Sequence, residues 1–208
     1  MLQIAGADFE PVMVKLHKGE QNSPEYHAIN PRGQVPVLVV DPESNSPVVL
    51  TQIVAIISYV NDVFPSAQFL PTEPLAKARA MSTLAWMNNT VHPTFTHIFM
   101  PHKFTNNPAI HSDLSVFNRK LYATQLAELN AMVEAKNTRQ ARYLLGSEIG
   151  PLDLYCLTLT RWGGMAGIDP TAHNAALWAH IQMVAAHPLV AEVVTRERLQ
   201  LNVFQTGS

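Results

Sequence analysis

Hydrophobic and polar positions follow two different strand patterns in the first fifty residues. From Pro11 to His17, every second residue is apolar (Val12, Val14 and Leu16), which is the period-two pattern of a strand with one buried face. Residues 34–41 form an apolar run rich in β-branched residues, typical of a strand buried on both faces. Turn residues at 42–47 and the apolar residues 48–50 predict a short antiparallel partner for this second strand.

The period changes after Thr51. Ile53, Ile57 and Val60 fall on one helical face and predict a helix packed on the sheet. Three prolines between residues 64 and 74 interrupt regular structure, so we predict a sheet-and-helix part at 1–65 and an all-helical part at 72–208.

The second part has helical spacing almost throughout. Thr72 is the expected N-cap of a helix that runs toward Thr90 and bends near Pro93, and Ser112 is the expected cap of a long helix. Further helices are predicted at 151–162, 174–186 and 189–199. The predicted fold class is therefore an α/β part followed by an all-α part.

Composition excludes several classes of function. The chain has 208 residues, of which 47% are hydrophobic and 14% charged, and its formal net charge is -2 without any run of like charge. Such a chain is expected to fold around a packed core and to bind neither nucleic acid nor an anionic membrane. Its most apolar stretch is shorter than the roughly 20 residues that span a bilayer. One cysteine, Cys156, and no secretory signal favour the cytoplasm.

Several motifs carry a resemblance to a known family. Residues 30–38 read Asn-Pro-Arg-Gly-Gln-Val-Pro-Val-Leu, and residues 50–56 read Leu-Thr-Gln-Ile-Val-Ala-Ile. Together they resemble the N-P-x-G-x-V-P-x-L and L-x-E-S-x-A-I segments of glutathione transferases. Residues 144–155 and 174–190 resemble later helical segments of the same family, so the resemblance covers essentially the whole chain in the right order.

The resemblance implies a thioredoxin-like N-terminal part, truncated here, that binds glutathione, followed by the family's helical domain. It implies a cis Val35–Pro36 bond that turns the backbone of Val35 toward the cysteinyl unit of the ligand, where the alternative is a trans proline at a strand start. Gln34 would reach the glycine carboxylate, or else be a solvated amide at the strand edge. An exposed strand end and a helix N-terminus suit a short anionic peptide, because they offer backbone groups and positive potential.

The chain departs from the family where the γ-glutamyl end of glutathione is held. Gln52 and Ile53 occupy the positions of the family's acidic residue and serine. Losing hydrogen bonds to charged groups costs about 1.5–3 kcal/mol each, so weak glutathione binding is expected. The alternative role for Ile53 is a core contact on its helix.

A second departure concerns catalysis. In the family a Tyr, Ser or Cys after the first strand activates the glutathione thiol. That segment would precede Met1, so no residue of this sequence is expected to inherit the role and the catalytic residue is unknown. Either the sequence begins too late or strands are exchanged between chains, and little conjugation of glutathione to chlorodinitrobenzene is expected.

Other residues have chemistry that fits a functional role. By the resemblance, His92, Phe95 and Phe99 line the pocket of the second substrate; the alternatives are a surface or interface role for His92 and a core role for both phenylalanines. The histidines at 92, 97, 102 and 111 lack the spacing of a zinc site, so no metal is expected. Cys156 lies in an apolar segment that would make it inert.

Asp153 is predicted to support folding. In the family a Ser or Thr caps this buried helix and the Asp completes a capping box, whereas here Gly150 and Pro151 leave half of the box. We expect Asp153→Ala to destabilise the chain by on the order of 1 kcal/mol.

The sequence thus predicts a cytoplasmic, homodimeric glutathione-transferase-like protein. Its chemistry would be attack of the glutathione thiolate on a hydrophobic electrophile, with glutathione as co-substrate. Two alternatives remain open: a non-catalytic binding or regulatory protein that keeps the fold, and a carrier of apolar ligands.

Overall fold

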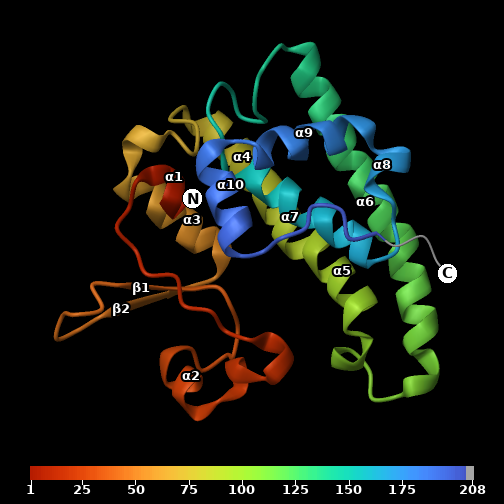
Figure 1. Cartoon of the computed structure of the whole chain (residues 1–208), viewed down its shortest axis with the longest axis horizontal. Coiled ribbons are helices and arrows are strands. Elements are labelled where there is room, and N and C mark those ends of the chain that lie inside the picture. The colour runs from red at the N-terminus through yellow and green to blue at the C-terminus, as the bar shows by residue number, and fades with distance from the viewer. Residues whose placement is uncertain (205–208) are drawn as a thin grey trace. The chain divides into compact units, whose positions relative to one another are not determined.

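A computed structural model describes residues 1–204 of the chain. The chain divides into two compact units, Met1–Ala67 and Gln68–Ser208, which Figure 1 colours from red to orange and from yellow to blue.

The N-terminal unit contains a two-stranded antiparallel sheet and a helix packed on it. Strand β1 (Val37–Val40) pairs with β2 (Val48–Thr51) in a register that runs from Val37 opposite Thr51 to Val40 opposite Val48. Helix α3 (Ile53–Val63) contacts both strands and buries Ile56, Ile57 and Val60. The short helices α1 (Leu2–Ala5) and α2 (Pro24–Ile29) complete the unit, together with 3₁₀ turns at Leu16–Lys18, Glu20–Asn22 and Pro65–Ala67. The predicted hairpin and the helix after it are confirmed.

The strand predicted between Pro11 and His17 is wrong. Val12 and Met13 are 78% and 63% exposed, and the segment runs as irregular chain into the turn Leu16–Lys18. Within residues 1–204 neither β1 nor β2 pairs with it. The backbone N–H of Lys15 instead donates to Oε2 of Glu20 at 2.7 Å. Alternating residues form a strand only where a neighbouring strand supplies ladder partners.

The hairpin is also less buried than its apolar run predicts. Val39 is 37% exposed, and Val48 and Val49 are 52% and 39% exposed. Only the strand face that packs on α3 is covered, so β1 is not buried on both faces.

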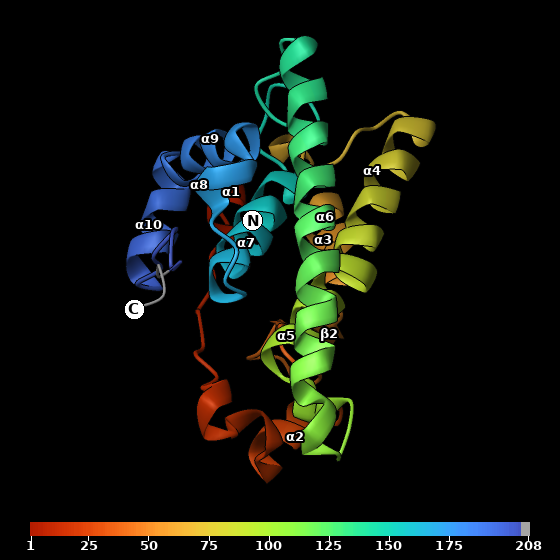
Figure 2. The same cartoon turned by 90° about the vertical axis from the view of Figure 1, so that its right-hand side faces the viewer.

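In its described part the C-terminal unit is built from helices, with one isolated antiparallel bridge between Tyr143 and Gly146. Its helices are α4 (Pro74–Trp86), α5 (His92–Phe99), α6 (His111–Thr138), α7 (Pro151–Met165), α8 (Pro170–His173), α9 (Ala175–Ala185) and α10 (Pro188–Arg196). Short 3₁₀ turns, Pro101–Lys103 and Pro108–Ile110, join α5 to α6. Helix α7 is central, because it packs against α4, α5, α6, α8 and α9, and α5 lies beside the long helix α6 (Figure 2).

Two predicted helix starts are displaced. Glu73, not Thr72, caps α4, because its carboxylate accepts hydrogen bonds from the N–H groups of Leu75 at 2.8 Å and Ala76 at 2.6 Å. Ser112 caps nothing: Asn107 caps the turn Pro108–Ile110, which leads directly into α6 at His111.

A π-helical turn, Met87–Val91, lies between α4 and α5, just before Pro93, where a bend was predicted. Proline has no N–H and its ring crowds the carbonyl one turn earlier, so a regular helix cannot continue through Pro93 unchanged. A wider turn accommodates it, and such turns occur often at functional sites.

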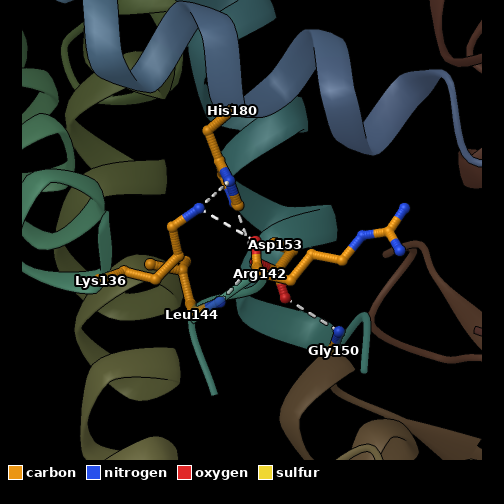
Figure 3. Close-up of polar contacts among 6 residues, drawn as sticks. All are labelled: Lys136, Arg142, Leu144, Gly150, Asp153 and His180. Atoms are coloured by element: carbon orange, nitrogen blue, oxygen red, sulfur yellow. Dashed lines mark hydrogen bonds and ion pairs between the residues drawn. The ribbon is translucent and has the colours of Figure 1, made fainter. Parts of the chain in front are cut away.

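A buried polar cluster holds the start of α7 (Figure 3). Asp153 Oδ2 accepts from the N–H of Gly150 at 2.9 Å, which confirms the predicted half of the capping box. Asp153 Oδ1 accepts from the N–H of Leu144 and contacts Nε2 of His180, both at 2.9 Å. The ammonium of Lys136 lies 3.3 Å from Nδ1 of His180 and donates to the carbonyl of Arg142 at 3.0 Å. Asp153 therefore joins α7, α9 and the loop before α7.

Among residues 1–204, no single helix is long and apolar enough to cross a membrane. Helices α9 and α10 reach the required length and composition only as a pair, bent by 88°. Helix α9 buries Leu177, Ile181 and Val184 within the protein core.

Candidate functional site

The predicted ligand-binding residues of the N-terminal unit lie at the entry to β1 and at the start of α3. The Val35–Pro36 bond is cis, as predicted. Gln34, Val35 and Pro36 are exposed, and Val35 as a whole residue is 40% accessible. The loop hydrogen bonds within residues 1–204 use neither the N–H nor the C=O of Val35.

Two side chains fix the backbone just before Val35. The carbonyl of Gln34 accepts a hydrogen bond from the amide of Asn30 at 2.7 Å and another from the hydroxyl of Tyr26 at 2.8 Å. Asn30 is 1% exposed, and its Oδ1 also accepts from the N–H of Arg32 at 3.2 Å. Sequence reasoning missed both Asn30 and Tyr26, although Asn30 belongs to the Asn-Pro-x-Gly motif that it used.

Gly33 completes this turn for a steric reason. Its φ of +60° lies in the left-handed region. A Cβ atom there would stand 3.0 Å from both the carbonyl oxygen of Gln21 and Nε2 of His27. The turn that delivers Gln34 and Val35 to the surface therefore requires glycine.

Gln52 and Ile53 lie beside this turn. Gln52 precedes α3 with φ +68° and ψ 114°, a strained conformation of the kind that clusters at functional sites. Its Nε2 donates to Oε1 of Gln34 at 3.4 Å, so the two predicted glutamines are brought together. Ile53 is half-buried as the first residue of α3. The two roles predicted for Ile53, a core contact and a ligand contact, both stay predictions.

This arrangement can bind a small anionic peptide. The first turn of α3 offers N–H groups and the positive end of the helix dipole to a carboxylate. The two glutamine amides can donate to a second carboxylate or accept from an amine. Neither carries a charge, so the hydrogen bonds that they form are weaker than those of an ionised partner.

The predicted second-substrate residues lie in the C-terminal unit and belong to one ring cluster. Phe95 is 6% exposed and stacks on Phe99 at 5.5 Å and on Trp162 at 4.8 Å between ring centroids. Phe99 is 49% exposed. The ring of His92 packs edge-on against Trp162, with 4.7 Å between the ring centroids. Phe95 is thus a core residue, as its alternative role predicted, while Phe99 and His92 reach the surface of the cluster.

Sequence reasoning missed the polar partners of His92. Its Nδ1 lies 3.0 Å from the hydroxyl of Tyr155, which donates to Oδ1 of Asn88 at 3.2 Å. Partial burial lowers the pKa of His92 and raises the pKa of Tyr155 to about 12. Since these residues are 63 and 67 positions apart in sequence, no local pattern signals the contact.

Cys156 and the histidines add no further site in the described residues. Cys156 is fully buried, and burial raises the pKa of its thiol, which leaves it protonated and inert. Among residues 1–204, no three His, Cys, Asp or Glu side chains stand close enough to hold a metal ion.

Comparison with known proteins decides the family. Residues 1–62 match the model of the glutathione S-transferase N-terminal domain. Glutathione S-transferase GST-4.5 of Xanthomonas campestris pv. campestris is 31% identical over 183 residues, which are 85% of this chain and 82% of that protein. The chain belongs to the glutathione S-transferase family.

Other glutathione S-transferase relatives give further detail. The crystal structure of a glutathione transferase homologue from sulfitobacter with bound glutathione has a TM-score of 0.83 and 25% identity, over 95% of this chain and 90% of that one. The maleylacetoacetate isomerase maiA of Aspergillus fumigatus is 39% identical over 82 residues, which are 38% of this chain and 36% of that protein. The fold is thus a thioredoxin-like N-terminal domain with a small sheet, followed by a helical C-terminal domain.

Proposed function

We propose that this glutathione S-transferase-family protein binds glutathione on its N-terminal unit and presents the thiol to a hydrophobic electrophile. The observation that carries the proposal is the turn at Gln34–Val35. Asn30 and Tyr26 fix the carbonyl of Gln34, and the next residue, Val35, is exposed and makes no loop hydrogen bond through its backbone within residues 1–204. The sulfitobacter relative, which has the same fold, was solved with glutathione bound.

Each part of glutathione has a partner in this arrangement. The backbone of Val35 pairs with the cysteinyl peptide unit, as a strand edge pairs with an extended peptide. The amide of Gln34 donates to the glycine carboxylate. The γ-glutamyl carboxylate meets the N–H groups at the start of α3, and Gln52 offers its side-chain oxygen to the ligand ammonium.

Binding is expected to be weak because Gln52 and Ile53 replace an acidic residue and a serine. Each missing hydrogen bond to a charged group costs about 1.5–3 kcal/mol, or at least a factor of ten in affinity for one of them. The free thiol, with a pKa of about 8.5, is mostly protonated at neutral pH, which also slows its attack on an electrophile.

The ring cluster of the C-terminal unit supplies apolar surface for the electrophile. We assign this role to the exposed face of Phe99 and to His92, with Phe95 supporting them from the core. We also propose a cytoplasmic homodimer, in keeping with the family. The alternative of a non-catalytic binding protein has no observation in its favour.

A calorimetric titration with glutathione tests the binding step. We expect saturable binding that weakens at least fivefold in Gln34→Ala, while Gln182→Ala, which removes an exposed glutamine of α9, leaves it unchanged. S-methylglutathione should bind about as well as glutathione, because the thiol is not an anchor. Absence of binding, or equal losses in both variants, overturns the proposed site.

Conjugation of glutathione to chlorodinitrobenzene tests the chemical step. We expect slow turnover that rises with glutathione concentration into the millimolar range. Measurable binding without any turnover would favour the non-catalytic alternative.

A further inference from the structure

Four polar side chains form a directed hydrogen-bond relay in the C-terminal unit. The amide of Asn88 donates to Oδ1 of Asn89 at 2.7 Å. The Oδ1 atom of Asn88 itself accepts a hydrogen bond from the hydroxyl of Tyr155 at 3.2 Å. Nδ1 of His92 lies 3.0 Å from the same hydroxyl oxygen.

The relay determines which nitrogen of His92 carries the proton. A tyrosine hydroxyl has a single proton, and Tyr155 gives it to Asn88. Its oxygen can therefore only accept from His92, which places the imidazole proton on Nδ1. In the neutral ring Nε2 is then an acceptor. Burial lowers the pKa of His92, which supports the neutral form near pH 7.

The free nitrogen reaches solvent. Within residues 1–204 Nε2 of His92 makes no hydrogen bond, and it is not among the fully buried polar atoms that lack a partner. The His92 ring is fixed by the edge-on contact with Trp162, at 4.7 Å and 65°. A fixed, accessible acceptor beside an aromatic cluster suits a ligand that is apolar but carries one hydrogen-bond donor.

Backbone geometry explains how two helices converge on Tyr155. Asn88 and Asn89 belong to the π-helical turn Met87–Val91, and His92 begins α5 directly after it. Asn88 and His92 are four residues apart, so they lie on neighbouring turns of one face and both reach Tyr155 of α7.

From this geometry we infer that Asn88 and Tyr155 are positioning residues that hold His92 as its Nδ1–H tautomer, leaving Nε2 as an acceptor that selects ligands with a hydroxyl or N–H donor. The assignment of the tautomer is independent of glutathione. The selection step rests on the proposed function, because it places the second substrate at His92.

The tautomer can be read from proton–nitrogen correlation spectra of ¹⁵N-histidine-labelled protein at pH 7.5–8 without ligand. The chain has nine histidines, so the His92 signals are assigned by their loss in His92→Gln. In the native protein we expect the Nδ1–H pattern. In Asn88→Ala the Tyr155 proton is released to Nδ1, so the Nε2–H pattern should become the major one. Asn88→Asp retains the acceptor and should keep the native pattern.

Tyr122→Phe is the matched control, because the Tyr122 hydroxyl donates to the carbonyl of Leu159, whereas the hydroxyl beside Nδ1 of His92 is that of Tyr155. It should leave the His92 pattern unchanged, whereas Tyr155→Phe should change it. An Nε2–H pattern in the native protein overturns the assignment. So does a His92 pattern that is the same in the native protein and in the four variants that keep His92, which are Asn88→Ala, Asn88→Asp, Tyr122→Phe and Tyr155→Phe.

The selection step uses two probes with the same ring. We expect para-methoxyphenol, which has a hydroxyl donor, to shift the Nε2 resonance of His92, and para-dimethoxybenzene, which has none, to leave it in place. Equal responses to the two probes, including none to either, overturn the selection step. Glutathione binding, measured separately by calorimetry, shows whether the proposed function fails as well.

Discussion

Asp153→Ala removes a fully buried carboxylate on which three hydrogen-bond donors converge (Figure 3). Two are backbone N–H groups, of Leu144 and Gly150, that lose their acceptor. Each buried polar group left without a partner costs about 1–3 kcal/mol. The third is Nε2 of His180; this side chain is 1% exposed, and its Nε2 also loses its partner, while its Nδ1 keeps the contact with Lys136. Because water can enter near the partly buried Leu144 N–H, we place the total at about 3–5 kcal/mol.

This value corrects the estimate of about 1 kcal/mol that treats Asp153 only as a helix cap. The cap accounts for the bond to Gly150, while the bonds to Leu144 and His180 attach α7 to the preceding loop and to α9. For a chain of this size each kcal/mol lowers the melting temperature by about 2–4 °C, so a drop of roughly 6–20 °C is expected.

Urea denaturation followed by circular dichroism measures the change in the free energy of unfolding. Asp113→Ala is the matched control, because Asp113 is an exposed acidic residue in the first turn of α6 and should contribute about 0.3–1 kcal/mol. A double-mutant cycle of Asp153→Ala with His180→Ala should show a coupling of at least about 0.5 kcal/mol. A loss in Asp153→Ala no larger than in the control would refute the reasoning.

Three further predictions concern the ligand site and the buried titratable groups. The double change Gln52→Glu with Ile53→Ser restores the family's charged and hydroxyl partners, so calorimetry should show a dissociation constant for glutathione that is at least tenfold lower. An unchanged dissociation constant would place the γ-glutamyl end of glutathione elsewhere. Asn30→Ala removes the hydrogen bonds of a buried amide to the carbonyl of Gln34 and to the N–H of Arg32, each worth about 0.5–1.5 kcal/mol. We therefore expect a loss of about 1–3 kcal/mol in urea denaturation together with weaker glutathione binding, and a fully stable variant would argue against this role. Burial raises the pKa of Cys156 and raises that of Tyr155 to about 12, so the folded chain keeps protons that the unfolded chain loses above about pH 9–10. The free energy of unfolding should therefore fall as pH rises beyond that point, and it should fall less steeply in Cys156→Ala. A free energy of unfolding that does not change with pH in this range would contradict the prediction.

Local patterns predicted the elements whose hydrogen bonds are local. The hairpin β1–β2 and helix α3 follow from an apolar run, a turn and a change of period within thirty residues. The segment 11–17 has an equally clear period, yet it forms no strand, because pairing depends on a neighbour that its own sequence does not specify. The predicted starts of two helices were wrong for a similar reason. Glu73 competes with Thr72 for the cap of α4, and Asn107 competes with Ser112 before α6, and which side chain reaches the free N–H groups decides between them.

The candidate site shows the same division. Gln34, Val35 and Gln52 were predicted as ligand-binding residues from a motif, and the structure brings the side chains of the two glutamines to 3.4 Å from each other. Asn30 was within the motif but its role needs the folded turn. The relay at His92 joins residues more than sixty positions apart, so only the packing of α7 against α5 reveals it.

The central claim is that glutathione binds at the turn Gln34–Val35 and at the start of α3, and mapping the site by backbone amide spectra tests it most directly. Titration of ¹⁵N-labelled protein with glutathione should shift the amides of Gln34, Val35, Gln52 and Ile53 together along one saturable curve. The same titration of Gln34→Ala should give a weaker curve at the remaining amides. Saturable shifts confined to other residues, with these four unmoved, would contradict the account.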